Sequence, residues 1–449
     1  MKTTSLVSFI MLFVFPVILF SQSAQGTWIH RLVESSKDKV QQAEALFRKG
    51  DAQNCFSVLE NACKQDSEMP PAQFLFGVLY LWNNNQASAR QIFEATGVKH
   101  ADYPGVYIIL ANLALQEGRS VEATLLYQKA LSLVEGKTWK PYQSQAFLDQ
   151  VYTGLANISE RREKWADALS YVEKLLALKG GKDGLLKQKM AILNFKSGKR
   201  ESAYQELSNA KLEKADLESP EITMVNLYTE AKMMEQAKKW VVFALQRNPK
   251  DSNVFYQAAQ WYWSNDDLAK AQETALQARQ LGAENTELKM LLGLIAREQK
   301  QFDEAEKIFA EINQQIPTHF GASNQLALVL IEQKEKEKKD KAVQIASMNA
   351  RLHSKNIVAL STLGWILLRL DNVNEAGKIF EAIVKGGNIT AETAYYLAHL
   401  TFKLNRLQDV KRWLEAAKQS NARFIHRKEV EDWLANLAKT PALENKTEK

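Results

Sequence analysis

Most of the chain alternates between short apolar stretches with helical spacing and short polar breaks. In one stretch Leu288, Leu291 and Leu292 recur three and four positions apart, which predicts one face of an amphipathic helix. A second stretch, containing Ala305 and Phe309, follows a polar break and has the same spacing. Two antiparallel helices joined by a short loop form a helical hairpin. The pattern therefore predicts a chain built from helical hairpins.

The hairpin pattern repeats along the chain with a period of 34 residues. When the Leu of the first helix is taken as position 7, position 8 is Ala or Gly in ten of eleven units. Position 20 is Ala in nine, once the insertion in unit 9 is allowed for. Neither position was used to set the register, so the repeat is real. The units start at residues 36, 70, 104, 149, 184, 218, 252, 286, 320, 357 and 391.

The residue types at fixed positions have a packing reason. Small residues at positions 8 and 20 let the two helices of a unit approach closely, and a large residue at position 24 fills the adjacent gap. Gly50, Gly118 and Gly198 fall between the two helices of their units. We expect a left-handed backbone there, since helices often end on such a glycine.

A 34-residue unit with Leu-Gly/Ala at positions 7–8, Ala at 20, Phe/Tyr at 24 and Pro at 32 resembles the tetratricopeptide repeat (TPR). The resemblance implies an all-α fold: a right-handed α-solenoid of about eleven repeats over residues 36–423, with a concave groove lined by the first helices. Residues 424–439 form one more amphipathic stretch, which we expect to be a capping helix over the last repeat. The polar residues 440–449 are expected to be a disordered tail.

Two insertions interrupt the period. Residues 138–148 lengthen the link between units 3 and 4, and they either bend the solenoid or extend the next helix. Residues 332–341 of unit 9 are rich in Glu and Lys, which is typical of a solvated helix extension. A docking site for an acidic partner is the alternative interpretation of this second insertion.

The amino terminus resembles an export signal. After Met1 and Lys2, an uncharged, largely apolar run covers residues 6–20 and is shorter than the ~20 residues that span a bilayer. Small residues that suit cleavage follow at 21–26. We expect a cleaved signal peptide over residues 1–26. The alternative is an uncleaved membrane tether through residues 6–20.

Composition and charge exclude several classes of protein. Charged residues make up 24% of the chain, and the net charge of +6 is spread along it without a basic cluster, so nucleic-acid binding is not expected. Only two cysteines are present, which excludes a disulfide scaffold. Cys55 and Cys63 are eight residues apart, about 12 Å along a helix, so we expect free thiols that serve as small core residues.

The sequence shows no catalytic motif. It contains no Gly-x-Ser-x-Gly elbow and no His-Glu-x-x-His pair, and the six histidines are scattered over separate units. No stretch of chain remains for a catalytic domain. We therefore expect no enzyme activity, no cofactor and no metal site.

The resemblance implies that positions 2, 5, 9 and 12 of each first helix face the groove. An Asn there can pair with both groups of a peptide backbone, and aromatic rings offer contact area at low entropic cost. Such groove aromatics can alternatively pack between neighbouring helices as core. No Lys or Arg stands at position 5, which argues against a carboxylate clamp. The predicted peptide-binding residues are Asn112, Asn157, Asn226, Tyr256, Trp263, Trp365 and Tyr395.

These features predict a non-enzymatic protein–protein interaction scaffold, exported to the bacterial periplasm or envelope. It would bind protein or peptide partners in the concave groove for the assembly or secretion of envelope components. A membrane-anchored TPR adaptor is one alternative, and a glycan- or peptidoglycan-binding helical repeat protein is another. The sequence leaves the oligomeric state open, as well as the choice between groove and convex face.

Overall fold

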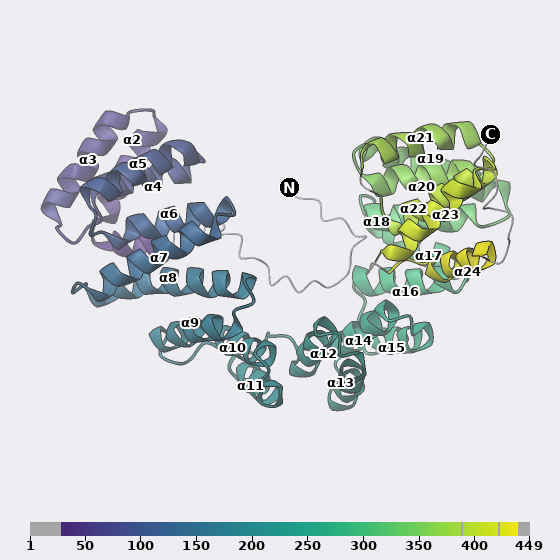
Figure 1. Ribbon diagram of the computed structural model, residues 1–449, viewed down its shortest axis with the longest axis horizontal. Helices are drawn as coiled ribbons and strands as arrows, with labels where there is room; N and C mark the ends of the chain where they lie inside the picture. The colour runs from purple at the N-terminus through teal and green to yellow at the C-terminus, as the bar shows by residue number, and fades with distance from the viewer. Residues whose placement is uncertain (1–27, 388, 421–422, 439–449) are drawn as a thin grey trace. The chain divides into compact units, whose positions relative to one another are not determined.

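The protein is described by a computed structural model over residues 28–387, 389–420 and 423–438, and every element in these ranges is a helix (Figure 1). The chain divides at residue 240 into two compact units. We call the described residues 28–240 the N-terminal unit and the described residues from 241 onward the C-terminal unit. The predicted signal peptide, the tether through residues 6–20 and the predicted tail at 440–449 lie outside the described residues.

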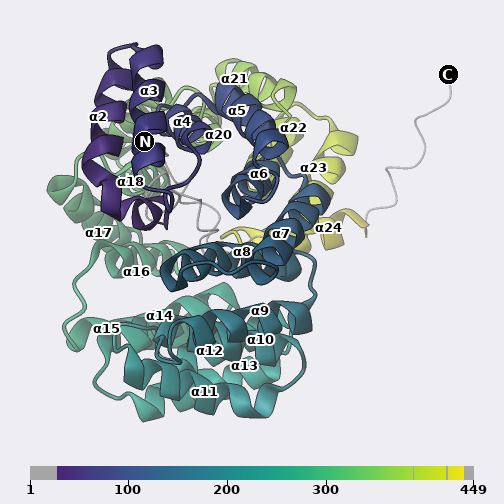
Figure 2. The same cartoon turned by 90° about the vertical axis from the view of Figure 1, so that its left-hand side faces the viewer.

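The N-terminal unit is a series of helical hairpins after a short 3-10 turn at Glu34–Ser36. Figure 2 shows the consecutive helices α9, α10 and α11 of this series side by side. Helix α13 (Met234–Arg247) crosses the boundary between the units. The other helices are α2 (Lys37–Arg48), α3 (Ala52–Gln65), α4 (Ala72–Trp82), α5 (Gln86–Lys99), α6 (Pro104–Gln116), α7 (Ser120–Glu135), α8 (Pro141–Arg161), α9 (Trp165–Leu178), α10 (Gly184–Lys196), α11 (Arg200–Glu213) and α12 (Pro220–Glu230).

The C-terminal unit continues the same series and ends in one additional helix. Its helices are α14 (Ser252–Ser264), α15 (Leu268–Gln280), α16 (Thr286–Glu298), α17 (Phe302–Gln315), α18 (Phe320–Ile331), α19 (Lys336–Leu352), α20 (Ile357–Arg369), α21 (Val373–Lys385), α22 (Ala391–Lys403), α23 (Leu407–Gln419) and α24 (Arg427–Ala438). In both units the even-numbered helix is the first of its hairpin and the odd-numbered helix is the second. The repeat array confirms the expected α-solenoid.

The first helices begin within two residues of the predicted starts in ten of the eleven units. The exception is α8, which begins at Pro141 rather than at 149 and is 21 residues long. Proline suits the first turn of a helix, where its missing N–H is not needed. The first insertion therefore extends a helix. Most of the second insertion also becomes helix, because α19 begins at Lys336 and runs for 17 residues.

Close helix packing follows from the small residues of the repeat. A Cβ added at Gly77, Gly293 or Gly364, all at position 8, would lie within 3 Å of the phenylalanine ring at position 24 of the same unit. The eleven residues at position 20 are each 0% exposed, which makes them the contact point of every hairpin. These residues are Cys55, Ala89, Ala123, Ala168, Ala203, Ala237, Ala271, Ala305, Ala342, Ala376 and Val410.

In ten of the eleven units, the turn between the two helices has a left-handed residue. Gly50, Gly118 and Gly198 have φ of +80°, +78° and +97°, as predicted. Other units place a residue with a side chain in the same conformation, which is strained for any residue with a Cβ. These residues are Asn84, Glu163, Lys232, Asp266, Lys300, Asp371 and Asn405, with φ between 56° and 67°.

Both cysteines are free thiols, as expected from the sequence. Cys55 is fully buried, whereas Cys63 is only partly buried and its Sγ donates to the carbonyl oxygen of Pro70 at 3.2 Å. Burial raises the pKa of each thiol to about 11. Neither thiol is therefore a reactive thiolate near neutral pH.

A short apolar segment precedes the first repeat, and the repeat pattern does not include it. Trp28, Ile29, Leu32 and Val33 are each at most 2% exposed. The ring of Trp28 lies 6.3 Å from that of Phe74 in α4, and 6.1 Å from that of Phe147 in α8. These four residues therefore belong to the core of the N-terminal unit, although the repeats start only at residue 36.

The last helix packs against α23, as a capping helix should. It also reaches the preceding first helix, because the ring of Trp433 lies 4.8 Å from His399 and 5.5 Å from Phe402, both in α22. Helix α24 therefore covers more than the final second helix. Among the helices of the described residues, none combines the length and the apolar character that crossing a membrane requires.

Candidate functional site

The first helices line the inner face of the C-terminal unit. Helices α14, α16, α18, α20 and α22 each contact the next in this order, and no comparable contact joins consecutive second helices in the described part of the unit. Elements on the inside of a curved stack lie closer together than those outside. The first helices are therefore on the inner side of this stack, and the predicted groove residues Tyr256, Trp263, Trp365 and Tyr395 lie on them.

Two of the predicted groove residues are buried in an aromatic cluster. Trp365 is 3% exposed and stacks on Tyr396, with ring centroids 4.5 Å apart. Tyr395 is 4% exposed, stacks on His426 at 4.3 Å and donates from its hydroxyl to Glu429 Oε2 at 2.6 Å. For Trp365 and Tyr395 the structure thus supports the alternative interpretation, in which groove aromatics serve as core.

The three predicted asparagines lie on α6, α8 and α12 of the N-terminal unit. Asn112 is 1% exposed, and its side-chain oxygen accepts a hydrogen bond from the Tyr127 hydroxyl. Asn157 and Asn226 are partly exposed. Asn157 Oδ1 accepts from Lys189 Nζ at 3.3 Å, and Asn226 Nδ2 donates to Glu218 Oε2 at 3.4 Å. Asn112 is thus a core residue, whereas the other two remain accessible.

The remaining two predicted residues form a partly exposed strip on α14. Tyr256 and Trp263 are seven positions apart, with Gln260 between them on the same helix face. We call these three residues the α14 strip. Gln260 Nε2 donates to the Tyr256 hydroxyl at 2.6 Å, and burial raises the pKa of Tyr256 to about 12, so the phenol stays neutral. Within the described residues, the buried Oε1 of Gln260 accepts no hydrogen bond.

One end of the α14 strip is held by charged residues that the sequence reasoning missed. The indole N–H of Trp263 donates to Glu298 Oε2 in α16 at 3.2 Å. The guanidinium of Arg423 lies over the Trp263 ring, 4.2 Å from its centroid. It also donates from Nη2 to Glu298 at 2.7 Å and from Nε to Asp266 at 3.1 Å. No local pattern predicts a contact between residues 125 positions apart.

A second polar group, centred on Arg297, joins first helices beyond the α14 strip. Arg297 of α16 is 6% exposed and donates from Nη1 to Gln325 Oε1 of α18 at 2.7 Å. Its Nη2 lies 3.5 Å from Glu392 of α22, which also accepts from the Tyr396 hydroxyl at 3.0 Å. This group joins three first helices. Of the four predicted site residues in this unit, the two on α14 remain partly exposed.

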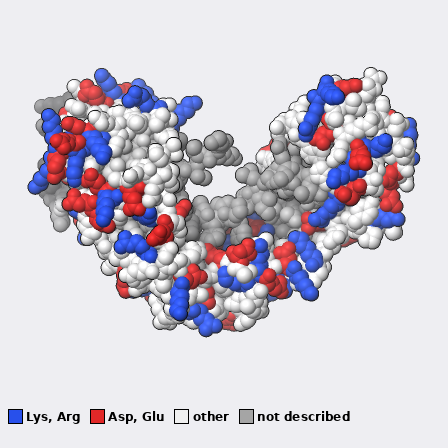
Figure 3. All heavy atoms as spheres, turned by 180° about the vertical axis from the view of Figure 1, so that it is seen from behind, with Lys and Arg blue, Asp and Glu red and all other residues white. Residues whose placement is uncertain are grey.

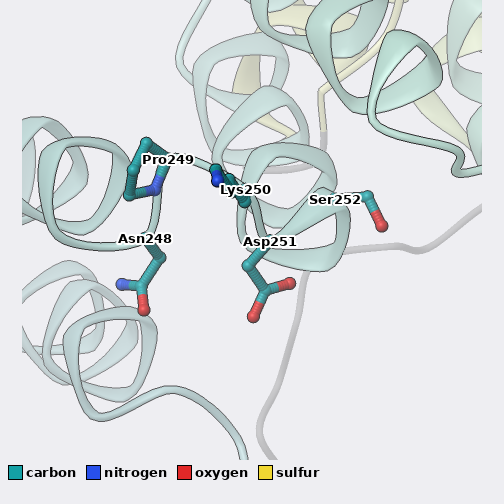
Figure 4. A pocket seen from close by; sticks show the side chains of 5 residues that line it. All are labelled: Asn248, Pro249, Lys250, Asp251 and Ser252. Atoms are coloured by element: carbon teal, nitrogen blue, oxygen red, sulfur yellow. The ribbon is translucent and has the colours of Figure 1, made fainter.

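A shallow hollow occurs where α13 is joined to α14, lined by residues 248–252 (Figure 4). The Asp251 carboxylate caps α14 by accepting from the backbone N–H groups of Asn253 and Val254, at 2.9 and 3.2 Å. The position of Asp251 in the hollow is thus explained by its capping of α14. In the part of the chain that the structure describes, no three His, Cys, Asp or Glu residues are grouped to hold a metal.

Basic and acidic side chains are interspersed over the visible face of each unit, without a large area of one sign (Figure 3). Several of them pair between neighbouring repeats. Arg90 donates to Glu117 at 2.8 Å, and Lys196 lies 3.0 Å from Glu230. On this face the charges therefore lie beside charges of the opposite sign rather than gather by sign.

No protein-family model and no curated protein matches this sequence. Solved structures with a similar arrangement of helices include yeast Tom70, with 14% identity over 90% of this chain and 96% of that chain and a TM-score of 0.37. A tetratricopeptide repeat protein from Parabacteroides merdae has 11% identity over 64% and 98%, with a TM-score of 0.35. A thermophilic TPR protein from Thermus thermophilus has 12% identity over 42% and 98%, with a TM-score of 0.36.

Proposed function

We propose that this protein is a non-enzymatic scaffold that binds a polypeptide segment along the α14 strip. The observation that supports the proposal is the strip itself: two partly exposed aromatic rings lie seven positions apart on one face of α14, with a partly exposed glutamine between them. The aromatic rings supply contact area, and the partly exposed Gln260 side chain is a polar group that can pair with a peptide backbone. The strip lies on the inner face, where first helices present several positions to one ligand.

The other predicted groove residues take different parts in this proposal. Asn112, Trp365 and Tyr395 are buried, and they shape the inner face by packing. Asn157 and Asn226 are accessible and remain proposed contacts for a partner of the N-terminal unit.

A co-purification experiment with matched variants tests the binding face. Tyr256→Ala combined with Gln260→Ala removes part of the α14 strip, whereas Met348→Ala changes an exposed apolar residue of the second helix α19. Each tagged variant is expressed in cells, and the polypeptides retained by it are quantified. We expect the double variant to lose a specific polypeptide that the wild type and Met348→Ala retain. Loss with Met348→Ala alone would place binding on the convex side.

We further propose export to the bacterial periplasm or envelope, with a role in assembling or secreting envelope components. The apolar run at 6–20, followed by small residues, supports this proposal. Mass spectrometry of the amino terminus should find cleavage between residues 21 and 26. An intact Met1 would instead favour the membrane-anchored adaptor. A reporter that works only outside the cytoplasm, fused after residue 30, should be active, and an inactive fusion would contradict export.

Binding of glycan or peptidoglycan is the competing function for the same aromatic rings. One face of Trp263 is already covered by the Arg423 guanidinium, which disfavours stacking of a sugar on that face. Binding of soluble glycans and of peptides from denatured protein can be compared directly on the full chain. We expect binding of the peptides only, and saturable binding of glycan that depends on Tyr256 would reverse the assignment.

A further inference from the structure

The charged end of the α14 strip has the composition of an arginine-binding site. Trp263 offers a flat indole face, and Glu298 and Asp266 offer carboxylates at its edge. We call these three residues the cradle. A guanidinium is planar and presents its donors in a fixed fork, so it can stack on the ring and pair with carboxylates at the same time. A lysine ammonium cannot make both contacts in this way.

The cradle is filled by a residue of the same chain. Arg423 lies between α23 and α24, and its side chain is 10% exposed. This occupant fits incompletely, because its Nη1 is buried without a hydrogen-bond partner among the described residues. A buried donor without a partner costs free energy, so the occupant is held less tightly than the cradle permits.

The cradle is continuous with the rest of the α14 strip. Trp263 lies one helical turn beyond Gln260 and two turns beyond Tyr256. A peptide whose arginine enters the cradle can therefore extend along α14 over Gln260 and Tyr256, which are both partly exposed. The carboxylates and the flat aromatic surface favour a polypeptide that carries an arginine.

We propose that the cradle is a binding site for an arginine of a partner polypeptide, and that Arg423 occupies it until the arginine of the partner displaces it. This inference rests on the proposed function, because it names the chemistry of the segment that the α14 strip binds. An intramolecular ligand acts at an effective concentration in the millimolar range. Arg423 therefore lowers the apparent affinity for any external arginine that competes for the same contacts.

A binding measurement on the full chain tests the proposal. The probes are two fluorescently labelled nine-residue peptides of Gly, Ser and Asn, one with a central Arg and one with a central Lys. Their dissociation constants are measured by fluorescence anisotropy for the wild type and for Arg423→Gln. We expect the variant to bind the Arg peptide at least tenfold more tightly than the wild type, with little change for the Lys peptide.

Two further variants serve as controls. Arg412→Gln removes the same charge from α23, where Arg412 stacks on Trp413 at 4.5 Å outside the cradle, and it should leave both affinities unchanged. Glu298→Gln, added to Arg423→Gln, should cancel the gain for the Arg peptide. If Arg423→Gln loses helicity by circular dichroism, Arg423→Lys keeps the charge without the fork and should give a smaller gain of the same sign.

Equal affinities for the wild type and Arg423→Gln, or an equal gain for both peptides, would overturn the proposal. This failure is distinguishable from failure of the proposed function. If the α14 strip variants lose their partner while the Arg peptide never binds, only the arginine site is wrong. If the Arg peptide binds Arg423→Gln while the strip variants keep all their partners, the scaffold assignment to this face is wrong.

Discussion

The smallest residues decide how closely the helices of each hairpin approach. Position 20 is fully buried in all eleven units, and the glycines at position 8 leave room for the ring at position 24. These contacts could be predicted from the sequence, because volume limits at a helix crossing restrict the residue type in every repeat. A contact that occurs in one place only, such as that of Arg423 with Trp263, does not recur with the repeat and could not be predicted from it.

A volume change at position 20 tests the packing argument. Ala271→Leu forces extra methyl and methylene groups into a fully buried contact and should destabilise the protein by about 1–3 kcal/mol. The control is Ala269→Leu, which changes an exposed residue of the same helix. Thermal or urea unfolding followed by circular dichroism compares them. Equal midpoints for the two variants would contradict the role of position 20.

The left-handed turn residues provide a second test at this scale. Glu163 has φ of +56° on an exposed turn, a conformation that costs a residue with a Cβ about 1–2 kcal/mol. Glu163→Gly should remove this strain and, after the greater flexibility of glycine in the unfolded chain is subtracted, stabilise the protein by about 0.5–1 kcal/mol. Glu163→Ala keeps the strain and is the control. A lower urea midpoint for Glu163→Gly than for Glu163→Ala would be the opposite of the expected result.

At the scale of elements, helix order and boundaries followed from the repeat, but their exceptions did not. Pro141 starts α8 early because the inserted residues continue the helix instead of forming a loop. The repeat pattern did not predict the buried segment at residues 28–33. Trp28 packs against Phe74 and Phe147, which come from two different helices. Helix α24 was predicted, but the contacts of its Trp433 with His399 and Phe402 in α22 were not.

The free energy of unfolding should depend on pH through two groups at the contact between α22 and α24. Burial lowers the pKa of His399 to about 4, and the hydrogen bond with His426 lowers the pKa of Glu429 to about 2. Between pH 6.5 and 4 the unfolded His399 takes up a proton that the folded one does not, so stability falls by up to about 3 kcal/mol. Below pH 4.5 the unfolded Glu429 takes up its proton first, which lowers stability again down to pH 2.

Urea midpoints measured from pH 8 to pH 4 check this expectation. The wild type should lose stability as the pH falls through this window, and His399→Gln should lose much less because it has no proton to bind. Thr401→Ser changes a buried hydroxyl residue two positions further along α22 and serves as the control, with the slope of the wild type. A slope that is the same in wild type and His399→Gln would contradict the assignment to His399.

At the scale of the whole molecule, the chain consists of helical hairpins whose charges are mixed and whose two cysteines are unreactive. The repeat predicted this architecture, whereas the groove lined by first helices was an implication of the family resemblance. It did not predict that Trp365 and Tyr395 would be buried, since the same residue type at the same position either faces solvent or packs, depending on the neighbouring helix. Burial therefore reduces the seven predicted residues to four accessible ones.

We propose above that a polypeptide binds along the α14 strip. Site-specific photocrosslinking in living cells tests this binding directly. A photoreactive amino acid is placed at Tyr256 and, as the control, at Met348 of α19. We predict a discrete light-dependent adduct with one polypeptide from position 256, and a much weaker one from position 348. Adducts from position 348 alone, or no specific adduct from position 256, would contradict the account.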